Sequence, residues 1–146
     1  MTSAKSRNGM PPSLKLALSI TDLAFIAYWI AAALSLVKVI EIPPSLMFAD
    51  YTVPSVVAWN WSFFPLDLAF SIIGLAAVHA SRKGNPIWQP LALISLVLTV
   101  VAGGMAVTYW AILRQFDLAW FLPNLLLLIW PLFFIPRLVR NLGRGE

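Results

Sequence analysis

The sequence predicts an all-α, polytopic membrane protein: a four-helix transmembrane bundle with both termini in the cytoplasm. Three observations support this fold class. Of the 146 residues, 60% are hydrophobic and 11% are charged, whereas an ordinary soluble domain has about 25% charged residues. The mean hydropathy is +0.84. Four apolar runs, each close to the roughly 20 residues that span a bilayer, alternate with polar segments. We therefore expect a single integral membrane domain over residues 1–146.

The first predicted helix covers about residues 14–39, after a polar and basic segment at residues 1–13. Its apolar run is longer than the hydrophobic core of a secretory signal, and further apolar runs follow it, which favours a retained signal anchor. Residues 40–58 form the longest loop, which is expected at the outer face. This loop is either an interfacial connector or a lid over the bundle.

The second predicted helix covers about residues 62–80, after a segment that is rich in Trp, Asn and Phe. Two starting points are open. A start near Val56 would put Pro65 inside the helix and kink it, whereas a start at Ser62 would put Pro65 in the first turn, where its missing N–H costs little. We favour the shorter helix, which places Asp67 near the outer surface and near a helix N-terminus, where an anion is stabilised.

The third predicted helix covers about residues 87–113, after a polar turn at residues 81–86 that contains Gly and Pro. It carries small residues at three- and four-residue spacing, a pattern that allows a neighbouring helix to approach closely. A second, shorter stripe follows on the same helix. The first stripe is Ala92, Ser95, Thr99, Gly103 and Ala106, and the second is Gly104, Thr108 and Ala111.

The fourth predicted helix covers about residues 118–136. Asp117 is expected to cap its N-terminus. Pro131 lies in its body and should kink it by leaving the carbonyl of Leu127 without its helical N–H donor. The basic residues 137–146 are expected to form a short tail.

The distribution of Lys and Arg predicts the orientation in the membrane, because cytoplasmic loops are enriched in both residues. Eight of the ten fall in segments that the alternation of helices puts on one side, namely Lys5, Arg7, Lys15, Arg82, Lys83, Arg137, Arg140 and Arg144, and the other two are Lys38 and Arg114. The prediction is a multi-pass protein of the bacterial inner membrane with both termini cytoplasmic.

The composition also argues against several classes of function. The basic residues form no stripe with interleaved aromatics, so nucleic-acid binding is not expected. With no Cys and with His79 as the single histidine, the chain has few ligands for a transition metal, and no metal or other cofactor is expected. No nucleophile elbow or Gly-rich phosphate loop occurs, so no catalytic residue is assigned and an enzyme is not favoured.

The candidate ligand-binding residues are the polar and aromatic groups at membrane depth. Asp22 is eight residues into the first helix and must face protein or water, because an ionised carboxylate in lipid costs a few kcal/mol. It is either a proton- or cation-binding group or a carboxylate that accepts hydrogen bonds from a neighbouring helix. A second group near the outer face is either a ligand site or a network that ties helices together. The full set is Asp22, Trp29, Asn60, Asp67, Arg114 and Asn124.

The first half of the chain resembles the YvaD-like family of small bacterial four-helix membrane proteins. The resemblance is carried by Thr21-Asp22, Tyr28-Trp29, Pro43, Phe48, Asp50-Tyr51, Pro54, Gly74-Leu75 and above all the run from Ala58 to Asp67. It implies a bacterial inner-membrane protein and transfers no catalytic residue.

Three functional hypotheses follow. The first is a binding or accessory protein whose polar pocket near the outer face holds a lipid-like or cationic amphiphilic ligand. The second is a proton-coupled small multidrug-type transporter that uses Asp22. The third is a membrane enzyme that acts on an isoprenoid- or sterol-like substrate, with Asp22 and Asp67 as its acid and base. The expected partners are the lipid bilayer, a small amphiphile, and a second copy of the chain or another membrane protein.

Overall fold

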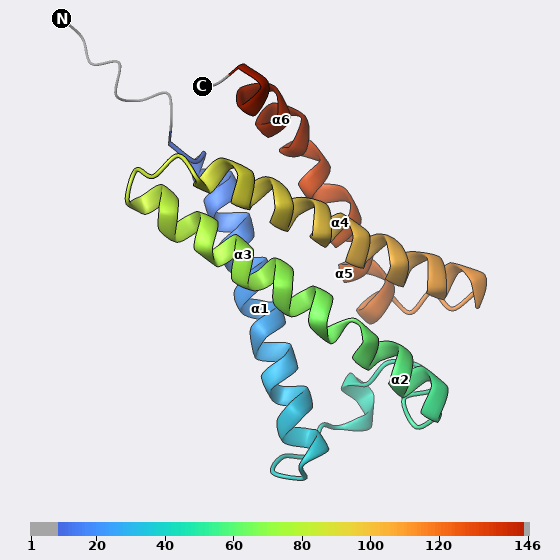
Figure 1. The fold of residues 1–146 in the computed structure, drawn as a ribbon. Helices are drawn as coiled ribbons and strands as arrows, with labels where there is room; N and C mark the ends of the chain where they lie inside the picture. The colour runs from blue at the N-terminus through green and yellow to red at the C-terminus, as the bar shows by residue number, and fades with distance from the viewer. Residues whose placement is uncertain (1–8, 145–146) are drawn as a thin grey trace, which may run out of the picture.

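The computed structural model describes residues 9–144, and within this range every regular element is helical (Figure 1). Four stretches of helix are long and apolar enough to cross a membrane. The all-helical fold class is therefore confirmed. The elements are α1 (Pro12–Leu36), the 3₁₀ turn η2 (Pro44–Leu46), α2 (Pro54–Ser62), α3 (Phe64–Arg82), α4 (Trp88–Ile112), α5 (Leu118–Ile129), the 3₁₀ turn η3 (Trp130–Phe133) and α6 (Ile135–Arg144).

The helices pack in chain order. In the described part of the chain, α1 packs on α3, α3 packs on α4, and α4 packs on α5 and α6 (Figure 1). The backbones of α1 and α5 do not approach each other closely, and the rings of Tyr28 and Trp120 meet edge-on at 6.1 Å between them. Away from this ring contact, the bundle is open along one side, between α1 and α5.

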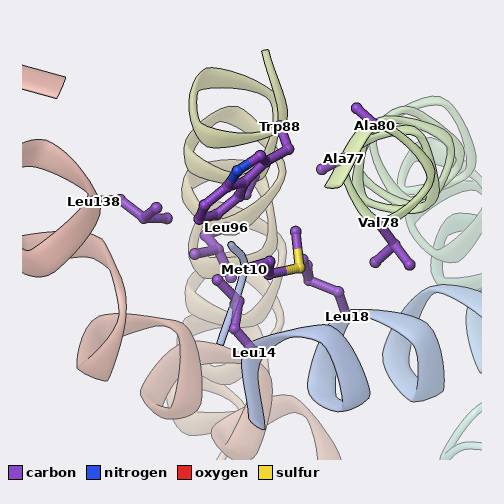
Figure 2. Close-up of a cluster of buried hydrophobic side chains, with 10 residues drawn as sticks. Met10, Leu14, Leu18, Ala77, Val78, Ala80, Trp88, Leu96 and Leu138 are labelled. Carbon is purple, nitrogen blue, oxygen red and sulfur yellow. The ribbon is translucent and has the colours of Figure 1, made fainter. Parts of the chain in front are cut away.

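One end of the bundle holds a cluster of buried apolar side chains. Figure 2 shows Met10, Leu14 and Leu18 between α3 and α4, close to Leu96. The start of α1, the end of α3, the start of α4 and α6 all contribute to this cluster. These elements meet because successive helices run in opposite directions.

The opposite end is closed by an aromatic cluster. Phe48, Val56 and Trp110 are buried there, and Trp59 and Trp120 pack against them. We call this set of five residues the aromatic cap. In the same region Gln115 Nε2 donates a hydrogen bond of 3.3 Å to Asp50, which joins the loop after α1 to the turn after α4.

The first helix differs from its predicted bounds of 14–39. It begins at Pro12, where proline suits the first turn because its missing N–H has no helical partner. It ends at Leu36, and Lys38 adopts φ +59° just beyond. The left-handed conformation at residue 38 ends the helix, a step that the apolar Val-Lys-Val-Ile run did not signal.

The second predicted span is two helices that meet at Phe63. Pro65 lies in the first turn of α3, as the shorter of the two starting points predicted. The expectation of a loop through residue 58 is wrong, however, because residues 54–62 form α2. Ser62 donates to the carbonyl of Trp59 and does not cap α3. The aromatic pattern suggested an interfacial loop, but Trp59 stacks on Tyr109 of α4 at 3.7 Å, and this contact holds α2 against the bundle.

The last predicted span is broken at Pro131, as expected. Asp117 caps α5, because its carboxylate accepts a hydrogen bond of 2.7 Å from the backbone N–H of Ala119. The helix is interrupted at η3, which contains Pro131. Residues 137–144, which were expected to form a tail, are helical, since α6 continues to Arg144. The segment with Lys5 and Arg7, which entered the orientation prediction, lies outside the described residues.

The first small-residue stripe of α4 is buried along its whole length, whereas Thr108 and Ala111 of the second stripe are exposed. At Gly103, a Cβ atom would lie 2.6 Å from the backbone N of Leu128 and 2.8 Å from the carbonyl O of Asn124. Because Gly103 has no side chain, α5 can approach α4 this closely. At Gly104, a Cβ atom would meet only the Leu128 side chain, at an ordinary 3.6 Å.

These neighbouring glycines form a matched pair. We expect Gly103→Ala to destabilise the fold by about 1–3 kcal/mol, because a methyl group there overlaps the backbone of α5. We expect Gly104→Ala to be neutral or stabilising by up to about 1 kcal/mol, because alanine favours a helix and has room. Unfolding followed by circular dichroism in detergent micelles measures both, and equal effects would contradict the packing of α5 described above.

Candidate functional site

A cavity of about 500 Å³ lies between α1, α2, α4 and α5, and α3 contributes Asp67 to its wall. Most of its lining is apolar or aromatic, as is usual for small-molecule sites. The polar side chains in the lining are Thr21, Tyr28, Asn60, Asp67 and Asn124.

Asp67 is the charged group of this cavity. It lies in the first turn of α3 and is 4% exposed. Its Oδ2 accepts a hydrogen bond of 3.0 Å from Trp29 Nε1 of α1. Its Oδ1 is buried and has no hydrogen-bond partner among the described residues. The helix N-terminus favours a carboxylate here, and the Trp29 bond satisfies only the other oxygen.

Asn60 and Asn124 come from two different helices of the cavity wall. Tyr28, the neighbour of Trp29 on α1, donates a hydrogen bond of 3.2 Å to Asn60 Oδ1 on α2. Asn124 of α5 donates one of 2.7 Å to the carbonyl of Trp120. Consecutive residues of α1 thus tie that helix to α2 and to α3, whereas the Asn124 amide bonds only within its own helix.

Aromatic rings pack around Trp29, whose N–H donates to Asp67. The Trp29 ring lies 5.2 Å from both Trp61 and Phe64, and 5.0 Å from Tyr28. Near the aromatic cap, the ring of Phe48 meets Trp120 edge-on at 5.5 Å. Tyr28, Trp29, Phe48 and Trp120 also line the cavity, and the face of an aromatic ring attracts positive charge.

Four of the six candidate residues line this cavity: Trp29, Asn60, Asp67 and Asn124. Arg114 does not. It is exposed, with φ +56°, in the turn between α4 and α5. Phe48 and Trp120 also line the cavity and were not among the predicted residues. Trp120 could have been found, because it lies one helical turn before Asn124, but the position of Phe48 depends on how its loop folds back.

Asp22 is separate from the cavity, buried where α1 meets α3 and α4. It is 0% exposed, and neither carboxylate oxygen has a hydrogen-bond partner among the described residues. The hydroxyl groups of Ser95 and Thr99 donate instead to the backbone carbonyls of Phe70 and Ser95. One of the two predictions for Asp22 was that side chains of a neighbouring helix donate hydrogen bonds to it. The described residues contain no such hydrogen bond.

The Asp22 carboxylate occupies the space beside Gly74 of α3. A Cβ atom at position 74 would overlap this carboxylate and lie 2.8 Å from Ser95 Oγ. Gly74 follows Asp67 by seven residues, which is about 10 Å along a helix. Asp22 and Asp67 therefore lie about two helical turns apart, and of the two only Asp67 lines the cavity.

Gly74→Ala tests this arrangement. We expect a loss of about 1–3 kcal/mol in the free energy of unfolding, because the added methyl group overlaps the Asp22 side chain. The same substitution in an Asp22→Ala background should cost clearly less, because the overlapping group is gone. A double-mutant cycle by denaturant unfolding measures the difference. An identical cost in both backgrounds would exclude the contact.

Comparison with known proteins agrees with the resemblance noted from the residues. A model described as a family of unknown function (DUF5360) matches residues 14–144. The chain is 45% identical over 128 residues to "Uncharacterized protein YvaD" of Bacillus subtilis (strain 168), covering 88% of this chain and 92% of that protein. No solved structure matches. The resemblance to YvaD is confirmed, and the chain belongs to this family of unknown function, DUF5360.

Proposed function

We propose that this protein is a small multi-pass protein of the bacterial inner membrane that binds an amphiphilic ligand with a cationic head group. The observation that supports this most is the Asp67 carboxylate. It lines an apolar cavity of about 500 Å³ and has one oxygen without a partner among the described residues.

The energetics favour a cationic group beside Asp67. A carboxylate that leaves water without a counter-charge costs several kcal/mol. The Trp29 bond satisfies one oxygen only. An ammonium group at Oδ1 would supply the missing charge and would also contact aromatic rings. The apolar remainder of the cavity suits a hydrocarbon portion of the same molecule.

Binding is favoured over the transport and enzyme hypotheses because of Asp22. Both alternatives use its carboxylate, as a coupling group or as an acid or base. Asp22 is not among the residues that line the cavity. A ligand held at Asp67 therefore has no direct contact with it.

We further propose one integral membrane domain over residues 1–146 with both termini in the cytoplasm. Arg82 and Arg137 lie at the end of the bundle that holds Met10 and Leu138. Lys38 and Arg114 follow the ends of α1 and α4, toward the aromatic cap. The positive-inside rule assigns the end that is richer in Lys and Arg to the cytoplasm.

Thiol labelling tests the orientation, and the absence of native Cys makes single-Cys variants clean reporters. In intact cells, a membrane-impermeant maleimide should label Ser45→Cys, in the loop after α1, and should not label Gly143→Cys, near the end of α6. Both should react in permeabilised cells. The reverse pattern in intact cells would invert the proposed orientation.

Ligand binding is tested with dodecyltrimethylammonium as the probe, on protein in nanodiscs of zwitterionic lipid. We expect the probe to raise the melting temperature of the wild type. Asp67→Asn should weaken binding at least tenfold, or about 1.4 kcal/mol, because it removes the charge but keeps an acceptor for Trp29. Asn60→Ala should weaken it less.

Asp50→Asn is the matched control, since Asp50 is an exposed carboxylate at the same end of the bundle. It should bind the probe as the wild type does. If Asp67→Asn lowers stability without any probe and leaves the response to the probe unchanged, Asp67 is a structural tie between helices and the proposal fails.

A further inference from the structure

Side chains close both ends of the cavity. At the end with the loop after α1, Phe48 is 6% exposed and packs in the aromatic cap. At the other end, Leu14, Leu18 and Leu96 are buried in the cluster of Figure 2, and Trp130 packs against it. A ligand that came from water on either side would have to displace one of these clusters.

The side of the cavity is open. Residues of α1 and α5 both line the cavity, yet the backbones of the two helices do not approach each other closely, and the ring contact that joins them, Tyr28 with Trp120, lies beside the aromatic cap. The residues at the edges of this gap are apolar and outward-facing: Ile20 of α1 is 61% exposed and Leu126 of α5 is 55% exposed. In a bilayer these edges contact acyl chains, so the gap is continuous with lipid.

The cavity is polar toward one end and apolar toward the other. Asp67 and Asn60 lie at the level of Tyr28 and Trp29, on the side of the aromatic cap. Toward the other end the lining is mainly Ile20, Leu127 and Trp130, with Thr21 as the polar exception. From Ile20 to Trp29 the cavity follows α1 for about 14 Å. Its polarity matches an amphiphile that stands along the helices.

We infer that the ligand is a single-chain cationic amphiphile that enters sideways from the lipid, through the gap between α1 and α5. It lies with its cationic head at Asp67 and its chain toward Trp130. This inference rests on the proposed function and adds the route of entry and the chemical class of the ligand. Its head would come from the leaflet on the side of the aromatic cap, because Asp67 is nearer that end.

Ala24 provides the test, because it is exposed on α1 and lines the cavity, whereas Ala27 is exposed on the same helix and does not line it. We expect Ala24→Trp to obstruct the gap and to weaken binding of dodecyltrimethylammonium at least tenfold, with a slower association rate. Ala27→Trp should change both by less than twofold. Tetramethylammonium, which has the head but no chain and does not enter lipid, should give no thermal protection.

A second variant with its own control keeps the test decisive if Ala24→Trp does not fold. Leu126→Trp obstructs the gap from α5, and Ile129→Trp is its control, exposed on the same helix but absent from the cavity lining. Either obstructing variant that folds and weakens binding supports the inference. If folded Ala24→Trp and Leu126→Trp bind as their controls do, lateral entry is wrong while the proposed function stands.

The remaining outcomes also decide the question. If the wild type does not respond to dodecyltrimethylammonium, the proposed function and this inference fail together. If tetramethylammonium protects as well as the long-chain probe, the ligand comes from water and the inference fails. If Ala24→Trp changes the oligomeric mass in light scattering and not the binding, a second copy of the chain occupies the gap and the inference fails.

Discussion

The interface between α1 and α3 depends on two carboxylates that cannot face hydrocarbon. Asp22 of α1 packs against Gly74 of α3, and Asp67 of α3 accepts a hydrogen bond from Trp29 of α1. The two contacts lie about two helical turns apart. Each helix therefore inserts its own acidic residue into the surface of the other, and the pair of contacts sets both the rotation and the register of α1 on α3.

The rest of the bundle differs in how closely its helices approach. The small residues of α4 allow α3 and α5 to pack tightly on it, and at Gly103 the approach is limited by backbone atoms of α5. In the described residues the backbones of α1 and α5 do not come this close, and the ring contact of Tyr28 with Trp120 joins the two helices beside the aromatic cap. The close packing of α3, α4 and α5, together with the gap between α1 and α5, leaves a cavity. Asp67 is the only charged residue that lines it. The proposed ligand site is thus a consequence of which helix pairs have small residues and which do not.

Local chemistry explains the elements that were predicted well. Asp117 caps α5 and Pro65 opens α3, because both effects act within one helical turn. The errors arise where a distant contact decides. Residues 54–62 are helical and held against α4 by the stacking of Trp59 on Tyr109, a contact between residues fifty positions apart. Residues beyond the predicted end at 136 continue as α6, with Leu138 buried in the cluster of Figure 2.

The amino-acid sequence alone determined the helical class and the approximate positions of four apolar helices, and four of the six candidate residues chosen from it line the cavity. These follow from hydropathy and from the cost of polar groups in lipid, both of which are local properties of the chain. Only the tertiary structure decided that Asp22 and Asp67 occupy separate places, that Arg114 is remote from the cavity, and that Phe48 closes one end. Those facts depend on how helices distant in the chain rotate and pack, and side-chain spacing along one helix does not specify the neighbour it will meet.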